Sequence, residues 1–197
     1  MKHVSLLIKP ASSLCNMRCV YCFYADEALH REHKSLGVMS EATAELLIDA
    51  AFSAQEGRGA VSFSFQGGEP TMAGLPFFER FTEMVRRRNV QNVPVRYAIQ
   101  TNGLNIDARW ADFLSREQFL TGVSVDGGEA LHDTFRPDAE GRGTYAAVTQ
   151  KLRLLLDKGV STNLLCVVNG QTARRPRQVY RSLKALNTGY LQFIPCL

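Results

Sequence analysis

The sequence lacks any long apolar run and any N-terminal targeting segment. No stretch of about eighteen consecutive apolar residues occurs in the 197 residues, so the sequence predicts no membrane-spanning helix and no membrane partner. The N-terminal Met1-Lys2-His3 leads directly into a short apolar, strand-like run rather than into a signal peptide. We therefore expect a soluble cytoplasmic protein, in which cysteines stay reduced and disulfides are rare.

Positive charge is present but is not arranged as a nucleic-acid-binding stripe. Lysines and arginines exceed acidic residues by 23 − 19 = 4, and the basic groups at 86–88 and 174–177 are short and carry no interleaved aromatics. We interpret both groups as solvated helix ends, predict no nucleic-acid partner, and leave open a weak attraction to an acidic partner. A content of 45% hydrophobic and 21% charged residues is typical of one globular domain, which we expect to span residues 1–197.

Three of the five cysteines lie within one short segment. Cys15, Cys19 and Cys22 follow one another at spacings of four and three residues. Three thiolates can hold a [4Fe–4S] cluster and leave one iron open to another ligand. A structural zinc site prefers four ligands and would need His30 or His33 in addition, while a disulfide with one spare thiol is the third alternative.

The other two cysteines stand apart from this segment. Cys166 lies inside an apolar stretch, where a buried and inert thiol is the ordinary finding, and Cys196 is next to the last residue. We expect neither of them to be a metal ligand.

Strand-like apolar runs and helix-period stripes alternate along the chain. Six strands are predicted, at Ser5–Ile8, Ala60–Gln66, Val95–Thr101, Leu120–Asp126, Thr162–Val168 and Tyr190–Ile194. Between them we expect five helices, which begin after Ser40, at Pro76, after Asn105, after Thr144 as the capping residue, and at Arg177. The first helix carries Leu46 on its apolar stripe and is closed by Gly57-Arg58-Gly59, and residues 25–39 are predicted to be irregular.

The alternation of strand and helix at intervals of about thirty residues predicts a parallel sheet built from βα units. An open doubly wound sheet and a barrel both fit that count. In the second predicted strand, Val61, Phe63 and Phe65 share one face, while Ser62 and Ser64 share the other. Strands covered by helices on both faces should be apolar on both, so a polar face indicates a lumen and favours a partial (β/α)6 barrel.

Glycines and polar side chains follow the second and fourth predicted strands. The glycines of Gly67-Gly68-Glu69-Pro70 let the backbone approach a ligand closely, and Glu69 could accept hydrogen bonds from an ammonium group. Ser124 offers a hydroxyl suited to a ribose or a carboxylate-binding network, although plain turns at both places are the alternative. Catalytic and ligand-binding residues of barrels lie at the carboxyl ends of the strands, so we expect these residues to share one site with the cysteines.

The cysteine segment and its surroundings resemble a known enzyme family. The signature CxxxCxxC of the radical S-adenosylmethionine (radical SAM) enzymes is matched by Cys15-Asn16-Met17-Arg18-Cys19-Val20-Tyr21-Cys22. The longer run 8–24, and the run 192–197 at the other end, resemble the anaerobic sulfatase-maturating enzymes of that superfamily. The resemblance implies an α/β fold, a partial (β/α)6 TIM-like barrel of the radical SAM type. Residues 1–197 would be its core domain, as the N-terminal portion of a longer enzyme, with the C-terminal SPASM-type domain absent.

The resemblance also implies a role for individual residues. Cys15, Cys19 and Cys22 would hold the [4Fe–4S] cluster, and Tyr24 and Gln66 would be catalytic residues on the substrate side. Residues of the cysteine segment, the strand ends and the segment after the fourth strand would bind S-adenosylmethionine: Tyr21, Gly67, Gly68, Glu69, Ser124, Arg136 and Leu165. Arg136 is expected to pair with the cofactor carboxylate, because a fixed guanidinium offers bidentate geometry.

The reaction implied by the resemblance is reductive cleavage of S-adenosylmethionine, followed by hydrogen abstraction from a Cys or Ser of a sulfatase, which becomes formylglycine. The implied partners are a sulfatase or other protein or peptide substrate and an electron donor such as flavodoxin or ferredoxin. Two alternatives stay open: a radical SAM maturase of another peptide, and a non-catalytic zinc-binding interaction module.

Overall fold

The chain folds around one parallel sheet that is curved but not closed. The computed structural model describes residues 3–55 and 59–196. Its six strands are β1 (Val4–Ile8), β2 (Val61–Phe65), β3 (Val95–Thr101), β4 (Leu120–Ser124), β5 (Thr162–Val168) and β6 (Leu191–Pro195). All neighbours pair in parallel in the order β1-β2-β3-β4-β5-β6, so β1 and β6 form the two edges. The predicted partial barrel is confirmed.

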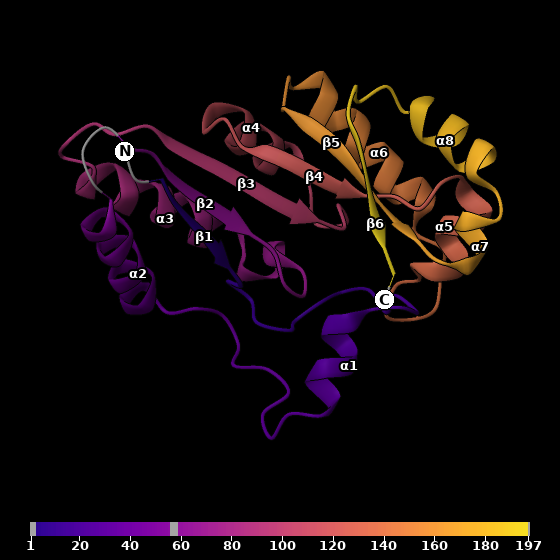
Figure 1. Cartoon of the computed structure of the whole chain (residues 1–197), viewed down its shortest axis with the longest axis horizontal. Helices are drawn as coiled ribbons and strands as arrows, with labels where there is room; N and C mark the ends of the chain where they lie inside the picture. Colours follow the sequence, from indigo (N-terminus) through magenta and orange to yellow (C-terminus); the bar gives the residue numbers. More distant parts are fainter. Residues whose placement is uncertain (1–2, 56–58, 197) are drawn as a thin grey trace.

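In the part of the chain that the structure describes, five longer helices connect the strands: α2 (Glu41–Ala54), α3 (Leu75–Arg88), α4 (Ala108–Arg116), α6 (Tyr145–Asp157) and α8 (Pro176–Lys184). Four shorter helices lie in the segments that follow strand ends: α1 (Phe23–Leu29), η1 (Pro70–Ala73), α5 (Glu129–Phe135) and α7 (Gly170–Ala173). Figure 1 shows the longer helices along one side of the sheet, while α1 projects from the end at which the strands finish. No helix within the described ranges is long and apolar enough to cross a membrane.

The outer face of β2 anchors the core through aromatic packing. Phe63 and Phe65 are buried and meet Phe81 of α3 edge to face, with ring centroids 5.2 and 5.1 Å apart. Edge-to-face pairs of this kind stabilise a core beyond the area that they bury. Ser62 and Ser64 on the opposite face are only half-buried, as the alternation along the strand predicts. The helices therefore cover one face and leave the polar face toward the lumen.

None of the four short helices, α1, η1, α5 and α7, was predicted. Residues 25–39 were expected to be irregular, but α1 extends to Leu29, and α5 occupies part of a loop that was expected to have no helix. Helix α1 buries none of its residues, and Phe23 is 66% exposed, so it is not stabilised by packing of an apolar stripe against the core. The fourth strand was predicted to reach Asp126 but ends at Ser124.

Helix starts were predicted with mixed success. The Ser40 hydroxyl accepts a hydrogen bond from the Thr43 amide at 3.1 Å and caps α2 as expected. Thr144 precedes α6, but its side chain does not cap the helix; Asp133 instead accepts from the amides of Thr144 and Tyr145, at 2.8 and 2.7 Å.

The interior stripe of α2 also differs from the prediction. Leu46 is 72% exposed, and the helix buries Ala44 and Ile48 together with Ala51, which was predicted to lie on the stripe. The predicted closing segment Gly57-Arg58-Gly59 lies mostly outside the described residues.

Candidate active site

The cysteine loop, residues 12–22, leaves the carboxyl end of β1. Cys15, Cys19 and Cys22 are free and half-buried in this loop. Cys166 is buried in β5 and Cys196 is exposed, as expected of cysteines outside the loop.

One side of the cysteine loop is bound to the glycine turn after β2. The Gly68 amide donates to the Ser12 carbonyl at 3.1 Å, and the Glu69 amide donates to the Leu14 carbonyl at 2.7 Å. A Cβ atom at Gly68 would lie 2.3 Å from the Leu14 carbonyl oxygen, so only glycine fits here without displacement. The two sequence motifs are therefore parts of one continuous structure.

The other side of the cysteine loop pairs with the segment after α5. The Arg18 amide donates to the Pro137 carbonyl, and the Val20 amide donates to the Phe135 carbonyl, both at 2.9 Å. These bonds fix the middle of the loop between two segments that come from different parts of the chain.

The Glu69 carboxylate is held by protein donors. Oε1 accepts from the Thr71 amide (3.0 Å), the Thr71 hydroxyl (2.6 Å) and the Thr101 hydroxyl (2.7 Å), and Oε2 accepts from the Asn102 amide (2.7 Å). Burial raises the pKa of Glu69, while these hydrogen bonds lower it. The side chain is 1% exposed and joins the ends of β2 and β3 rather than facing open space, where an ammonium group was expected to reach it.

Three asparagines form a network beside Cys15, and of these only Asn102 lies at a strand end where the sequence predicts functional groups. The Asn102 side-chain amide donates to Asn16 Oδ1 at 2.8 Å and lies 3.7 Å from Cys15 Sγ. Asn16 in turn donates to Asn105 Oδ1 at 3.0 Å. The position of Asn102 directly after β3 was the one sequence signal for this role.

A buried ion pair lies beside Cys19. The Arg136 guanidinium donates to the Asp126 carboxylate through Nε at 2.9 Å, and Nη1 lies 3.9 Å from Cys19 Sγ. The Tyr21 hydroxyl also donates to Asp126, and the Tyr21 ring lies 5.4 Å from the guanidinium carbon. Tyr21, predicted to bind S-adenosylmethionine, thus contacts the same ion pair.

A directional chain of hydrogen bonds supports this pair from α5. The Asp126 amide donates to His132 Nδ1 at 3.3 Å, so the ring proton is on Nε2, which meets the Thr144 hydroxyl at 3.0 Å. Thr144 then donates to the Arg136 carbonyl at 2.6 Å. Burial, together with the nearby Arg136 charge, lowers the pKa of His132 to about 4.

Tyr24 and Gln66, both predicted to lie on the substrate side, are in direct contact. The Gln66 side-chain amide donates to the Tyr24 hydroxyl at 3.1 Å, and the Lys9 ammonium lies 4.7 Å from the centre of the Tyr24 ring. The stem of Lys9 packs 3.1 Å from the place of a Cβ atom at Gly67. Burial raises the pKa of Tyr24, and the charge of Cys22 adds to this.

The other two predicted cofactor contacts lie opposite one another on adjacent strands. Ser124 of β4 is half-buried and pairs in register with Leu165 of β5. Leu165 is 3% exposed and packs over Gly122, where a Cβ atom would lie 2.9 Å from Leu165 Cδ1.

The three loop thiols suit an iron–sulfur cluster by their chemistry. They are unpaired, and Asn102 and Arg136 direct N–H groups toward two of their sulfurs, as is usual around metal-bound thiolates. Burial raises the pKa of Cys19 to about 11, and Arg136 opposes this rise. Among the described residues, no three His, Cys, Asp or Glu side chains already converge as they would around a single metal ion.

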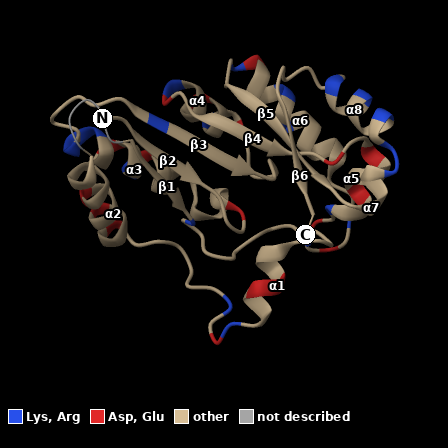
Figure 2. Cartoon of the chain, viewed as in Figure 1, with Lys and Arg blue, Asp and Glu red and all other residues tan. Residues whose placement is uncertain are grey.

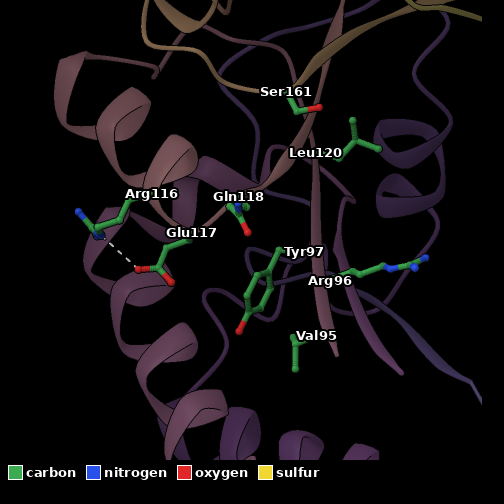
Figure 3. A pocket seen from close by; sticks show the side chains of 8 residues that line it. All are labelled: Val95, Arg96, Tyr97, Arg116, Glu117, Gln118, Leu120 and Ser161. Atoms are coloured by element: carbon green, nitrogen blue, oxygen red, sulfur yellow. Dashed lines mark hydrogen bonds and ion pairs between the residues drawn. The ribbon is translucent and has the colours of Figure 1, made fainter. Parts of the chain in front are cut away.

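A cavity of about 470 Å³ lies at the opposite end of the sheet (Figure 3). Its walls include the first residues of β3 and β4 and the residue before β5, namely Val95, Leu120 and Ser161. In (β/α) barrels, function resides at the carboxyl ends of the strands, so we assign this cavity no part in the site.

Comparisons with known proteins match the whole length of the chain. A model of the radical SAM superfamily matches residues 10–183. The cysteine-type anaerobic sulfatase-maturating enzyme of Clostridium novyi is 43% identical over 197 residues, which are 100% of this chain and 52% of that enzyme. The serine-type enzyme of Klebsiella aerogenes is 34% identical over 193 residues, 98% of this chain and 46% of that enzyme.

The structure of native anSMEcpe with bound AdoMet and the Kp18Cys peptide superposes with a TM-score of 0.92 at 42% identity. The superposition covers 100% of this chain and 52% of the solved chain. The chain thus spans about half the length of the curated relatives and solved structures that it matches.

Proposed function

Because the chain belongs to the radical SAM superfamily, we propose that it forms the core domain of an enzyme for anaerobic sulfatase maturation. In this proposal the substrate is a sulfatase cysteine, which is oxidised to formylglycine. The supporting observation is the identity of 43% with a cysteine-type enzyme over the full chain, against 34% with a serine-type enzyme.

Cys15, Cys19 and Cys22 would hold the [4Fe–4S] cluster. When bound, the cluster supplies one electron to S-adenosylmethionine, and this reductive cleavage provides the oxidant that removes a substrate hydrogen. The backbone at Gly67 and Gly68 would receive the cofactor next to the cysteine loop, because these residues are packed directly against that loop.

The remaining cofactor contacts are proposed from their positions. Tyr21, Ser124 and Leu165 lie at the carboxyl ends of the strands or on the cysteine loop, around the same opening of the half-barrel. Glu69 and Arg136 would support the cofactor-binding residues without contacting the cofactor themselves, because their polar atoms bind protein partners.

Tyr24 and Gln66 would act on the substrate side. Their hydrogen bond fixes the Tyr24 hydroxyl next to the cysteine loop, where it could exchange a proton with the substrate. The Lys9 ammonium over the ring favours this orientation of Tyr24, since a cation is attracted to the face of an aromatic ring.

The test is an anaerobic assay of the reconstituted protein with dithionite, S-adenosylmethionine and two sulfatase peptides that differ only in Cys or Ser. Mass spectrometry should detect formylglycine from the Cys peptide. Cys15→Ala, Cys19→Ala and Cys22→Ala should each lose iron, sulfide and the visible cluster absorption, whereas the exposed control Cys196→Ala should retain them.

The assay also separates the alternatives. Cleavage of S-adenosylmethionine without formylglycine from either peptide would point to a maturase of another peptide. Stoichiometric zinc without sulfide would support the zinc-binding module and end the enzyme proposal.

We also propose that the electron donor is an acidic protein such as flavodoxin or ferredoxin. The α7–α8 basic face comprises Arg174, Arg175, Arg177, Arg181 and Lys184, all of which are exposed (Figure 2). Within residues 3–55 and 59–196, none of these cations forms an ion pair, whereas Arg86, Arg87 and Arg88 each pair with a carboxylate.

The position of these charges supports a partner of opposite sign. Arg174, Arg175 and Arg177 surround the first turn of α8, where the helix dipole disfavours positive charge. An acidic protein would offset this repulsion, and the face follows β5 at the same end of the sheet as the cysteine loop.

Charge reversal tests the basic face. Arg174→Glu combined with Arg177→Glu should slow reduction by flavodoxin and weaken its salt dependence, while the rate with dithionite stays unchanged. Arg153→Glu on α6, also exposed and outside any ion pair of the described residues, is the matched control. Equal rates with flavodoxin in all three proteins would contradict a role for this face.

A further inference from the structure

Arg136 is fixed between a carboxylate and a cysteine sulfur. Nε and Nη2 donate to Asp126 Oδ2 and Oδ1 at 2.9 and 3.4 Å, while Nη1 lies 3.9 Å from Cys19 Sγ. The two side chains of the ion pair are 8% and 0% exposed. The fork of the guanidinium is therefore already occupied, and the one terminal nitrogen outside it is directed at the sulfur.

The carboxylate that holds Arg136 is itself immobilised. Asp126 Oδ1 accepts from the Val167 amide of β5 at 2.9 Å, and Oδ2 accepts from the Tyr21 hydroxyl of the cysteine loop. A buried charge with this many fixed partners cannot turn away without leaving other groups unsatisfied. The position of the guanidinium relative to Cys19 is thus determined by the sheet and not by a flexible side chain.

We propose that the Asp126–Arg136 pair sets the reduction potential of the cluster bound through Cys19, with Arg136 raising the potential and Asp126 moderating it. The inference rests on the proposed function, because it requires that Cys19 bind a cluster. Hydrogen bonds to cluster sulfurs and nearby charge are the principal protein determinants of cluster potential. Reduction adds negative charge to the cluster, so a nearer cation favours the reduced form and a more distant anion opposes it.

This role differs from the one that the sequence suggested for Arg136. A guanidinium that pairs with the cofactor carboxylate would present its fork to the lumen, whereas the fork here faces Asp126. Arg136 and Asp126 are positioning residues in this proposal: they act on the cluster ligand and do not touch the reacting atoms.

The experiment is a redox titration of the reconstituted protein, followed by electron paramagnetic resonance of the reduced cluster. Arg136→Met should make the cluster harder to reduce, with the ratio of reduced to oxidised cluster at a fixed potential falling about tenfold or more. Arg136→Lys, which keeps the charge but loses the fork, should lie between Met and the natural protein. Asp126→Asn should shift the potential in the opposite direction, since it removes the moderating anion.

Opposite shifts of the reduction potential in Arg136→Met and Asp126→Asn distinguish electrostatic control from damage to the structure. Damage would shift the potential of both variants in the same direction. If Asp126→Asn does not fold, the comparison of Arg136→Met with Arg136→Lys still decides the matter. Arg142→Met is the matched control, because Arg142 also pairs with a carboxylate nearby but is exposed, and it should leave the potential unchanged.

Three outcomes would overturn the inference. They are an unchanged potential in Arg136→Met with full cluster content, shifts of the same sign in Arg136→Met and Asp126→Asn, and equal potentials in Arg136→Met and Arg136→Lys. If the potential of Arg136→Met is unchanged but its affinity for S-adenosylmethionine falls tenfold, Arg136 would instead bind the cofactor carboxylate. A natural protein that assembles no cluster would refute the proposed function as well.

Discussion

The place of a Cβ atom at Gly68 lies 2.3 Å from the carbonyl oxygen of Leu14, so the glycine turn after β2 and the cysteine loop are in direct backbone contact. Gly68→Ala should force these segments apart and cost about 1–3 kcal/mol, as overpacking of a tight interior does. The variant should also bind less iron and sulfide, because Leu14 directly precedes Cys15.

Chemical unfolding of the apoprotein and metal analysis after reconstitution measure the two effects. Gly170→Ala is the control, since a Cβ atom there would meet nothing within 4 Å. The same stability and cluster content in both variants would show that the contact is dispensable.

Replacing Glu69 by glutamine should weaken the junction between β2 and β3. Four donors face the two carboxylate oxygens, so an NH₂ group at either place would confront another donor. We expect Glu69→Gln to lower the free energy of unfolding by about 1–3 kcal/mol, the usual cost of an unsatisfied buried polar group. Urea denaturation should detect this loss, and the exposed Glu79→Gln should show almost none.

His132 should make the fold sensitive to mild acid. Its pKa is about 4 in the folded protein and 6.5 for the ordinary group, so the unfolded chain binds more protons between these values. Stability is therefore complete above pH 6.5 and falls as the pH drops toward 4, by up to roughly 3 kcal/mol. Protonation of Nδ1 would also remove the acceptor of the Asp126 amide.

The measurement is the free energy of unfolding as a function of pH. His132→Gln should flatten the dependence between pH 4 and 6.5, whereas the exposed His30→Gln should leave it as it is. Identical slopes in the natural protein and His132→Gln would rule out His132 as the source.

Tyr24→Phe should separate the substrate reaction from cofactor cleavage. The change removes the hydroxyl that accepts from Gln66 but keeps the ring under Lys9. If this hydroxyl moves a proton, formylglycine production should fall by roughly 10²–10⁴-fold, while cleavage of S-adenosylmethionine without peptide continues. Tyr180→Phe, on the exposed surface of α8, is the control. A parallel loss of both activities would assign Tyr24 to cofactor binding instead.

Local sequence patterns were sufficient to predict the sheet. The bounds of β3 and β5 match the prediction residue for residue. A strand of this kind is recognised from an apolar run and the turn residues that flank it, all within a few positions of the sequence. Prediction failed where a distant residue decided the structure. Thr144 is a residue type that commonly caps helices, yet Asp133, eleven positions earlier, accepts the hydrogen bond from the Thr144 amide. The Thr144 hydroxyl donates to the Arg136 carbonyl instead.

The same limit applies to the site. The spacing of the three loop cysteines is a local signal, and it was sufficient to select this segment as a candidate site for an iron–sulfur cluster. Nothing local reveals that Asp126 holds Arg136, that Asn102 reaches Cys15, or that Glu69 is enclosed by hydroxyls and amides from two strands. The Glu69 contacts follow from β2 and β3 being neighbours in the sheet. The other two contacts depend on how the segments after β1, β3 and β4 fold over the end of the sheet.

The hydrogen bond from Arg136 to Cys19 joins residues 117 positions apart. A ribosome makes the cysteine loop first and its far wall, residues 135–137, much later. Contacts of such sequence separation form late, because the entropy of closing the intervening chain into a loop is lost before the contact contributes any favourable free energy. During synthesis, Cys19 is therefore made before Arg136, and β2, β3 and β4 are synthesised in the interval. We therefore expect the loop to bind iron and sulfide only after residues 135–137 have folded against it, which requires the thiols to stay reduced until then.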